Sequence, residues 1–272
     1  MITLAKKLIA CSGTTEELEV NGYVEFVSST PMTITPKYTN SGVTLQYSLD
    51  GITWTPIVSG SATPSANIIY FRGQATGTKS LYTSFNTSNA WTFTGSTNLE
   101  CNGKLDRLLQ NALGNDDDIL TIGNLCFASM FYNSATLIKA PELPATTLAT
   151  SCYLYMFFGC TALIVAPELP ATVLSQYCYE RMLENCTSLT TAPALPATVL
   201  VDSCYKQMFQ GCTKIKLSTT LTGIYDTAYR IPTTGTGTSA NDSLFNMFTS
   251  TGGTFTGTPT INTTYYTENT PV

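Results

Sequence analysis

Histidine is absent from this 272-residue chain, and charged residues make up only 11% of it. Without histidine, Ser-His-Asp and Cys-His catalysis are excluded and the commonest zinc ligand is missing. Glycosidase chemistry needs two paired carboxylates, and the sequence pairs no two candidates. The run Asp116-Asp117-Asp118 lacks the ligand spacing and distal acid of a calcium loop. We therefore expect no enzyme activity, no cofactor and no metal site.

Clustered positive charge and long apolar runs are missing as well. The net charge is −5 with a pI near 4.7 and no Lys/Arg cluster occurs, which disfavours nucleic-acid binding because it requires concentrated positive charge. No run reaches the roughly 18–20 apolar residues of a membrane span. Leu8-Ile9-Ala10-Cys11 matches a lipoprotein lipobox, but only three apolar residues separate Lys7 from Cys11, where a signal peptide needs about 7–15. We expect no signal peptide and no membrane insertion.

A 26-residue repeat occurs four times within residues 119–217. Each copy has Cys followed by an aromatic residue, Met four residues after the Cys, and a second Cys or Ser at +8. Leu or Ile follows at +11, and Ala-Pro-x-Leu-Pro-Ala-Thr closes the first three copies. The first positions of the four copies are Cys126, Cys152, Cys178 and Cys204. Such periodicity is the signature of a stacked repeat architecture.

The spacing within a repeat predicts a short helix. Positions 0, +4, +5 and +8 share one face of a 3.6-residue helix, and Gly or Asn at +7 is typical of a helix end. A brief Thr-x-Leu strand follows until the prolines stop it, and stacked repeats share one core. The predicted core residues are Cys152, Met156, Phe157, Cys160, Leu163, Cys178, Met182, Cys186, Leu189, Cys204, Met208, Phe209 and Cys212.

The nine cysteines could form disulfides or pack as free thiols. Cys152 and Cys160 would lie about 12 Å apart along one helix, which is too far for a disulfide. Cysteines of neighbouring repeats could approach bonding distance, but we expect reduced cysteines packed as small hydrophobic residues. Tyr153, Tyr179 and Tyr205 are candidates for glycan contact, although packing between helices explains them equally well. Trp54 and Trp91 could stack on sugars, and we favour core positions for both.

The first hundred residues change to an alternating pattern. Val43, Leu45, Tyr47 and Leu49 alternate with polar residues, and Asp50-Gly51 predicts a type I′ hairpin turn into a strand at 52–54. Further strands are predicted at 23–27, 32–35, 67–71 and 91–94. The predicted fold class is therefore α+β, with an antiparallel β-sandwich followed by a short leucine-rich-repeat solenoid of strands and helices with terminal caps.

Five segments follow from these patterns. Leu105, Leu108, Leu109, Ala112 and Leu113 have helical spacing, which predicts a cap helix. Ser243–Phe248 echoes the repeat motif after a 13-residue excess. The segments are an N-terminal anchoring arm (1–20), the sandwich (21–100), the cap helix and turn (101–118), the four repeats (119–217), and an insertion with a degenerate fifth repeat and a Thr/Gly-rich cap (218–272).

The repeat resembles the BspA-like leucine-rich repeats of gut-bacterial surface proteins and of their bacteriophages. The motif of that family corresponds to Met156-Phe157-Phe158-Gly159-Cys160 and Leu163, and the resemblance covers residues 120–265. It implies a non-enzymatic virion protein, such as a head or tail fibre or a decoration, exposed on the particle surface. Its implied partners are other virion proteins through the arm and a host-surface receptor or glycan, with assembly as a homo-oligomer such as a trimer. A bacterial cell-surface adhesin is the alternative.

Overall fold

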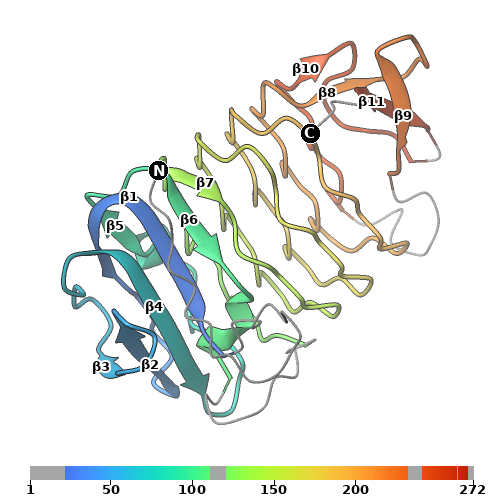
Figure 1. The fold of residues 1–272 in the computed structure, drawn as a ribbon. Coiled ribbons are helices and arrows are strands. Elements are labelled where there is room, and N and C mark those ends of the chain that lie inside the picture. The colour runs from blue at the N-terminus through green and yellow to red at the C-terminus, as the bar shows by residue number, and fades with distance from the viewer. Residues whose placement is uncertain (1–21, 111–120, 232–240, 262, 269–272) are drawn as a thin grey trace, which may run out of the picture.

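The computed structural model describes residues 22–110, 121–231, 241–261 and 263–268, and within these ranges the fold is almost entirely β. The predicted α+β class is wrong, because the described residues contain no α-helix. Their helical content is limited to two 3-10 turns, η1 (Thr87–Asn89) and η2 (Leu105–Leu108). Figure 1 shows a large sheet at one end, the stacked repeats in the middle and a small sheet at the other end.

The large sheet has seven strands and is formed mainly by the first hundred residues. Its order is β3-β2-β4-β1-β6-β7, with β5 paired to β1. The strands are β1 (Val24–Thr35), β2 (Val43–Ser48), β3 (Thr55–Ile57), β4 (Ala66–Ala75), β5 (Thr92–Thr94), β6 (Leu99–Asn102) and β7 (Leu137–Lys139). All pairs are antiparallel except β6 with β7, which joins the sheet to the first repeat.

The expected β-sandwich is therefore wrong, because the first repeat covers the inner face of the sheet. Phe26 and Phe93 lie 6.4 and 5.6 Å from the ring of Phe131 in that repeat, and the Trp91 amide donates to the Met130 carbonyl (2.9 Å). Alternating hydrophobicity indicates that one face of a sheet is buried, but it does not indicate what covers that face. Sheet and repeats share one hydrophobic core.

The predicted hairpin exists with a different turn. Strands β2 and β3 pair antiparallel, but β3 begins only at Thr55, so 52–54 is loop and not strand. Only Gly51 in the connection has a positive φ (72°), whereas a type I′ turn needs two. The Asp50 carboxylate holds the loop instead, because it accepts the amides of Ile52 (2.8 Å) and Thr53 (2.7 Å).

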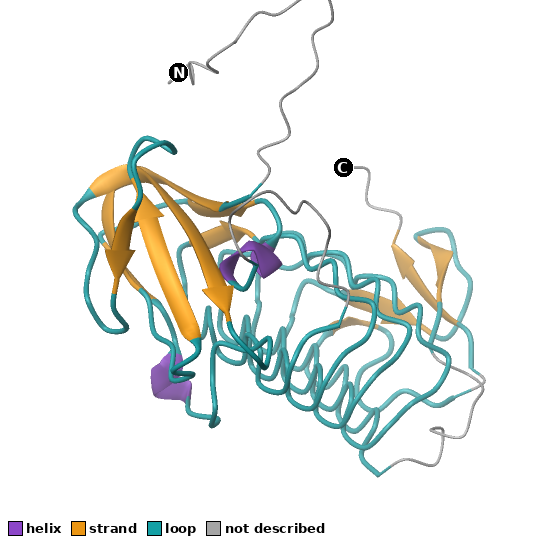
Figure 2. Cartoon of the chain, turned by 90° about the horizontal axis from the view of Figure 1, so that it is seen from below, coloured by secondary structure: helices purple, strands orange, loops and turns teal. Residues whose placement is uncertain are grey.

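Each repeat begins with a series of tight turns, and Figure 2 shows these segments side by side along one face. Alternate amides bond in two directions. The Met130 amide donates to the Phe127 carbonyl within its own segment (3.2 Å), and the Phe127 amide donates to the Cys152 carbonyl of the next repeat (2.8 Å). We call the surface over these segments the turn face; the segments are 124–133, 150–159, 176–185, 202–211 and 241–250.

Every fourth residue of a turn segment has a left-handed backbone. Ser151, Tyr155 and Gly159 have φ values of 56°, 56° and 69°, which no right-handed helix contains. The helices predicted from the 0, +4 and +8 spacing are therefore wrong, and so is the leucine-rich-repeat solenoid of strands and helices. The brief strand expected in every repeat is present in the first one as β7, whereas the second has only isolated bridges such as Lys139 to Val165. Over a single repeat, a period of four and a period of 3.6 place nearly the same side chains inward, so the sequence pattern does not separate them.

The predicted cap helix is also wrong over its described part, where η2 is a 3-10 turn; residues 111–120 lie outside the described residues. At the other end, 241–250 continues the stack. The amides of Tyr205 and Phe209 donate to the carbonyls of Ser243 (3.0 Å) and Met247 (3.0 Å). The small sheet beside it has the order β10-β8-β11-β9, formed by β8 (Lys216–Ser218), β9 (Tyr225–Tyr229), β10 (Gly252–Gly253) and β11 (Tyr265–Glu268).

Within the described part of the chain, no helix has the length and apolar character needed to cross a bilayer.

Candidate functional site

The residues predicted to form the repeat core are fully buried. Each has an exposed fraction of 0%, and the set is Cys152, Met156, Phe157, Cys160, Leu163, Cys178, Met182, Cys186, Leu189, Cys204, Met208, Phe209 and Cys212. The eight described cysteines are all free and buried; Cys11 lies outside the described residues. This inward half of the repeat is structural.

The thiols at the +8 position also satisfy backbone carbonyls. The Cys160 thiol donates to the Phe131 carbonyl of the preceding repeat (3.2 Å), and Cys186 makes the same contact with Phe157 (3.2 Å). Burial raises the pKa of both thiols. Because only the thiolate is a good nucleophile, these cysteines are packing groups and not reactive ones.

The hypothesis that Tyr153, Tyr179 and Tyr205 contact a glycan is wrong. Their exposed fractions do not exceed 1%, and their rings stack on one another at 5.7 and 5.6 Å inside the core. Burial raises the pKa of all three hydroxyls. In a helix, position +1 would turn away from position 0, whereas the turn-segment backbone directs both positions inward.

The tryptophans divide between the two faces of the large sheet. Trp91 is 3% exposed, and its indole nitrogen donates to the Lys37 carbonyl (3.0 Å). Trp54 is half-buried on the outer face, where the Arg72 guanidinium lies 4.1 Å from its ring centroid and Tyr23 packs at 5.8 Å. The core position predicted for Trp54 is therefore wrong.

Partly exposed aromatic residues gather on the turn face of the first two repeats. Tyr132 and Phe158 occupy the same repeat position and stack at 4.8 Å. Tyr155 packs on both, at 6.2 and 5.6 Å, and on Phe85 of the N-terminal region at 5.5 Å. Phe85 is 42% exposed, so this cluster is open to solvent although the stack beneath it is rigidly hydrogen-bonded.

Charged and amide side chains continue the cluster across the third and fourth repeats. The Arg181 guanidinium lies 5.4 Å from the Tyr155 ring, and its Nη1 is 3.5 Å from Glu184 Oε2. Gln210 Nε2 donates to Glu184 Oε1 (3.2 Å), and Gln207 Nε2 donates to Gln210 Oε1 (2.7 Å). We call this surface the turn-face patch; it comprises Phe85, Tyr132, Tyr155, Phe158, Glu180, Arg181, Glu184, Gln207 and Gln210.

Two polar atoms of the patch lack hydrogen bonds. Glu184 Oε2 and Arg181 Nε are buried and have no hydrogen-bond partner among the described residues. Burial raises the pKa of Glu184, although the charge of Arg181 opposes this effect. Buried polar groups are usually satisfied, so this unsatisfied acceptor and donor are a feature that a ligand could complete if the partly exposed Arg181 side chain moved aside.

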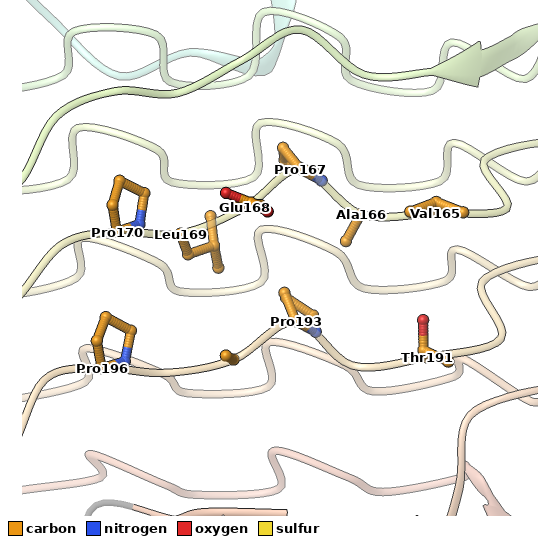
Figure 3. A pocket seen from close by; sticks show the side chains of 10 residues that line it. Val165, Ala166, Pro167, Glu168, Leu169, Pro170, Thr191, Pro193 and Pro196 are labelled. Atoms are coloured by element: carbon orange, nitrogen blue, oxygen red, sulfur yellow. The ribbon is translucent and has the colours of Figure 1, made fainter. Parts of the chain in front are cut away.

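A second surface feature is an open groove of ≈ 460 Å³ between the proline segments of the second and third repeats. In Figure 3, Pro167 and Pro170 of one repeat lie in line with Pro193 and Pro196 of the next. Proline has no backbone N–H group to donate, so these segments cannot pair as strands of a continuous sheet. The fourth repeat has no proline segment. In its place, Tyr229 of β9 contacts the third repeat, where its hydroxyl donates to the Pro193 carbonyl (3.0 Å).

No metal centre is visible, since the described residues contain no group of three or more His, Cys, Asp or Glu side chains that could hold an ion. The run 116–118, for which the sequence predicts no calcium loop, lies outside them. Comparison with known proteins is equally silent: no family model, curated protein or solved structure matches this chain.

The turn-face patch was not predicted from the sequence, although one signal was available. Inward positions of the repeat hardly vary, whereas position +3 is Ser129, Tyr155, Arg181 and Gln207 in turn. In a repeat architecture, a position that varies while its neighbours stay constant is little constrained by the core and is a candidate for binding, although Ser129 and Gln207 are themselves buried here.

Proposed function

We propose that this chain is a non-enzymatic attachment protein of a bacteriophage particle, such as a head or tail fibre or a surface decoration, which contacts the host surface through its turn face. The observation that carries the proposal is the division of labour within the repeat. Constant inward residues build a rigid stack, and variable outward residues assemble one aromatic and charged patch. Aromatic residues and arginine are the side chains that binding surfaces favour.

The non-enzymatic part of the proposal is supported by the state of the reactive groups. The cysteine thiols are buried with raised pKa values, and the chain has no histidine. Glu180 and Glu184 face one arginine between them, since Arg181 lies 4.0 and 3.5 Å from their carboxylates. Such pairing suits recognition and stability better than proton transfer.

The virion part rests on the sequence resemblance of the repeats to BspA-like proteins of gut bacteria and their phages. In this proposal, residues 1–20 mount the protein on other virion proteins, the stack is exposed on the particle surface, and copies assemble as a homo-oligomer such as a trimer. The second candidate is a bacterial cell-surface adhesin built on the same repeat.

Mass spectrometry of purified particles and of host envelopes separates the two candidates. Peptides of this chain that copurify with infectious particles through a density gradient are the expected result. Peptides confined to the envelope of uninfected cells would instead assign the protein to the adhesin class.

A further inference from the structure

We propose that the turn-face patch is a binding site for a neutral saccharide, which packs on its rings and displaces the Arg181 side chain so that a sugar hydroxyl pairs with Arg181 Nε and Glu184 Oε2. This inference rests on the proposed attachment function and names the class of molecule that the patch would bind. Three independent features of the patch lead to it, namely its rings, its unsatisfied atoms and its charge.

The rings provide the apolar half of a sugar site. A pyranose exposes C–H groups as well as hydroxyls, and C–H groups pack well against aromatic rings, which are apolar and carry negative charge on their faces. Tyr132, Tyr155 and Phe158 form one continuous cluster with centroid distances of 4.8–6.2 Å. Phe85 extends it from a different part of the chain at 5.5 Å from Tyr155, so a ligand wider than one ring would find contacts on both sides.

The unsatisfied atoms provide the polar half. The Glu184 side chain is only 6% exposed, and Gln210 fixes one of its oxygens. Its other oxygen, Oε2, lies near Arg181 but too far for a hydrogen bond (3.5 Å from Nη1), and Arg181 Nε is unsatisfied too. A hydroxyl group donates one hydrogen bond and accepts others. Both atoms are covered in the unliganded protein, so the Arg181 side chain, which is 31% exposed, would shift to admit a sugar hydroxyl that accepts from Nε and donates to Oε2. A buried acceptor that gains a partner recovers the cost of its desolvation.

The charge of the patch selects against acidic sugars. Three carboxylates, Glu180, Glu184 and Asp242, act on this surface together with two cations, Arg181 and Lys206. Lys206 is already paired with Asp242 at 3.0 Å, and both glutamates share Arg181. A sialic or uronic acid would bring a further negative charge to a surface on which three carboxylates already face two cations, and like charges disfavour binding. A neutral hexose meets no such penalty.

Calorimetric titration of the full chain tests this assignment. The probes are a panel of neutral hexose oligosaccharides, which includes galactose- and glucose-terminated chains, and oligogalacturonate as the acidic counterpart. We expect at least one neutral oligosaccharide to bind and oligogalacturonate to bind at least tenfold more weakly. Tyr155→Ala should weaken the neutral ligand about tenfold or more. Glu184→Gln should also weaken it, and should narrow the discrimination against oligogalacturonate, because the repelling charge is gone.

Two further variants control for damage to the stack. Phe85→Ala removes an exposed ring outside the repeats and should weaken binding while the melting temperature is unchanged. Trp54→Ala removes a half-buried ring from the outer face of the large sheet and should leave the affinity as it is. Failure of every neutral oligosaccharide to bind, equal binding of oligogalacturonate, or equal sensitivity to Trp54→Ala would overturn the assignment.

A cell-binding assay keeps this inference distinct from the proposed function. If the chain binds host cells through the patch but neutral saccharides do not compete, the ligand is a protein or an acidic polymer. That result would contradict the saccharide assignment and support the attachment function. If the chain binds saccharide in solution but no cell, the attachment function falls instead. Patch variants that change the oligomeric state in analytical ultracentrifugation would assign the surface to a second copy of the chain and overturn the saccharide assignment.

Discussion

Replacing Phe157 with alanine removes one ring from an aromatic column that links the large sheet to the repeats. Phe93 of β5 stacks on Phe131 at 5.6 Å, and Phe131 stacks on Phe157 at 5.4 Å. Phe157 is fully buried, and deletion of a buried phenylalanine ring costs about 3–5 kcal/mol. Native domains have about 5–15 kcal/mol of stability in total, so the variant should fold with a large fraction of its stability lost.

Urea denaturation followed by two probes measures both the size and the reach of this loss. Trp54 and Trp91 are the only tryptophans and both precede the repeats, so their fluorescence reports on the large sheet. Hydrogen exchange by mass spectrometry reports on the amides of 150–212. Because sheet and repeats share one core, we expect the same loss of unfolding free energy from both probes.

Two control variants calibrate this result. Phe157→Leu should cost less than half as much, because Leu183 fills the equivalent position of the next repeat. Phe245→Ala removes a ring that is 44% exposed and should change stability by no more than about 0.5 kcal/mol. An unchanged fluorescence transition in Phe157→Ala, beside fast exchange in the repeats, would refute the continuous core.

Four more predictions follow from individual contacts. Gly159→Ala should destabilise the fold by about 1–3 kcal/mol in thermal denaturation, because φ is 69° and a Cβ would collide with the Asn133 side chain; adding Asn133→Gly should recover part of the loss. Arg230→Met should lower the melting temperature, because the guanidinium donates to the Leu195 and Ala197 carbonyls. The eight buried cysteines should resist iodoacetamide until the protein unfolds, as peptide mass spectrometry would show. Burial raises the pKa of Glu184, so the native state binds more protons than the unfolded state just above pH 4.5. The free energy of unfolding should therefore rise as the pH falls into that window. In urea titrations, Glu184→Gln should reduce this dependence of the unfolding free energy on pH.

The sequence pattern predicted which residues face the core, but not the backbone that directs them there. Cys152, Met156 and Cys160 are inward in a helix and equally inward in a segment of period four. What decides between the two is where the amides bond. In a helix they all bond within the segment, whereas here alternate amides bond to the next repeat. That choice depends on stacking between copies, which the spacing inside one copy does not encode.

Local backbone signals were only partly readable for the same reason. Gly159 and Asn133 signalled a left-handed backbone, as the structure has it, but Tyr155 and Arg181 adopt one too (φ 56° and 53°). A left-handed conformation costs an ordinary residue about 1–2 kcal/mol, so no propensity argument predicts it there. The ladder of hydrogen bonds between repeats stabilises this backbone. The same backbone brings the residues of the turn-face patch together on one surface.

The central claim is that this chain attaches to a host surface through the turn face. Its most direct test is the binding of fluorescently labelled protein to intact host cells, measured by flow cytometry for the wild type and for Phe85→Ala and Tyr155→Ala. The account predicts saturable binding by the wild type, with at least a tenfold weaker half-saturation for both variants. Wild-type binding that neither variant changes, or the absence of saturable binding to any host cell, would contradict it.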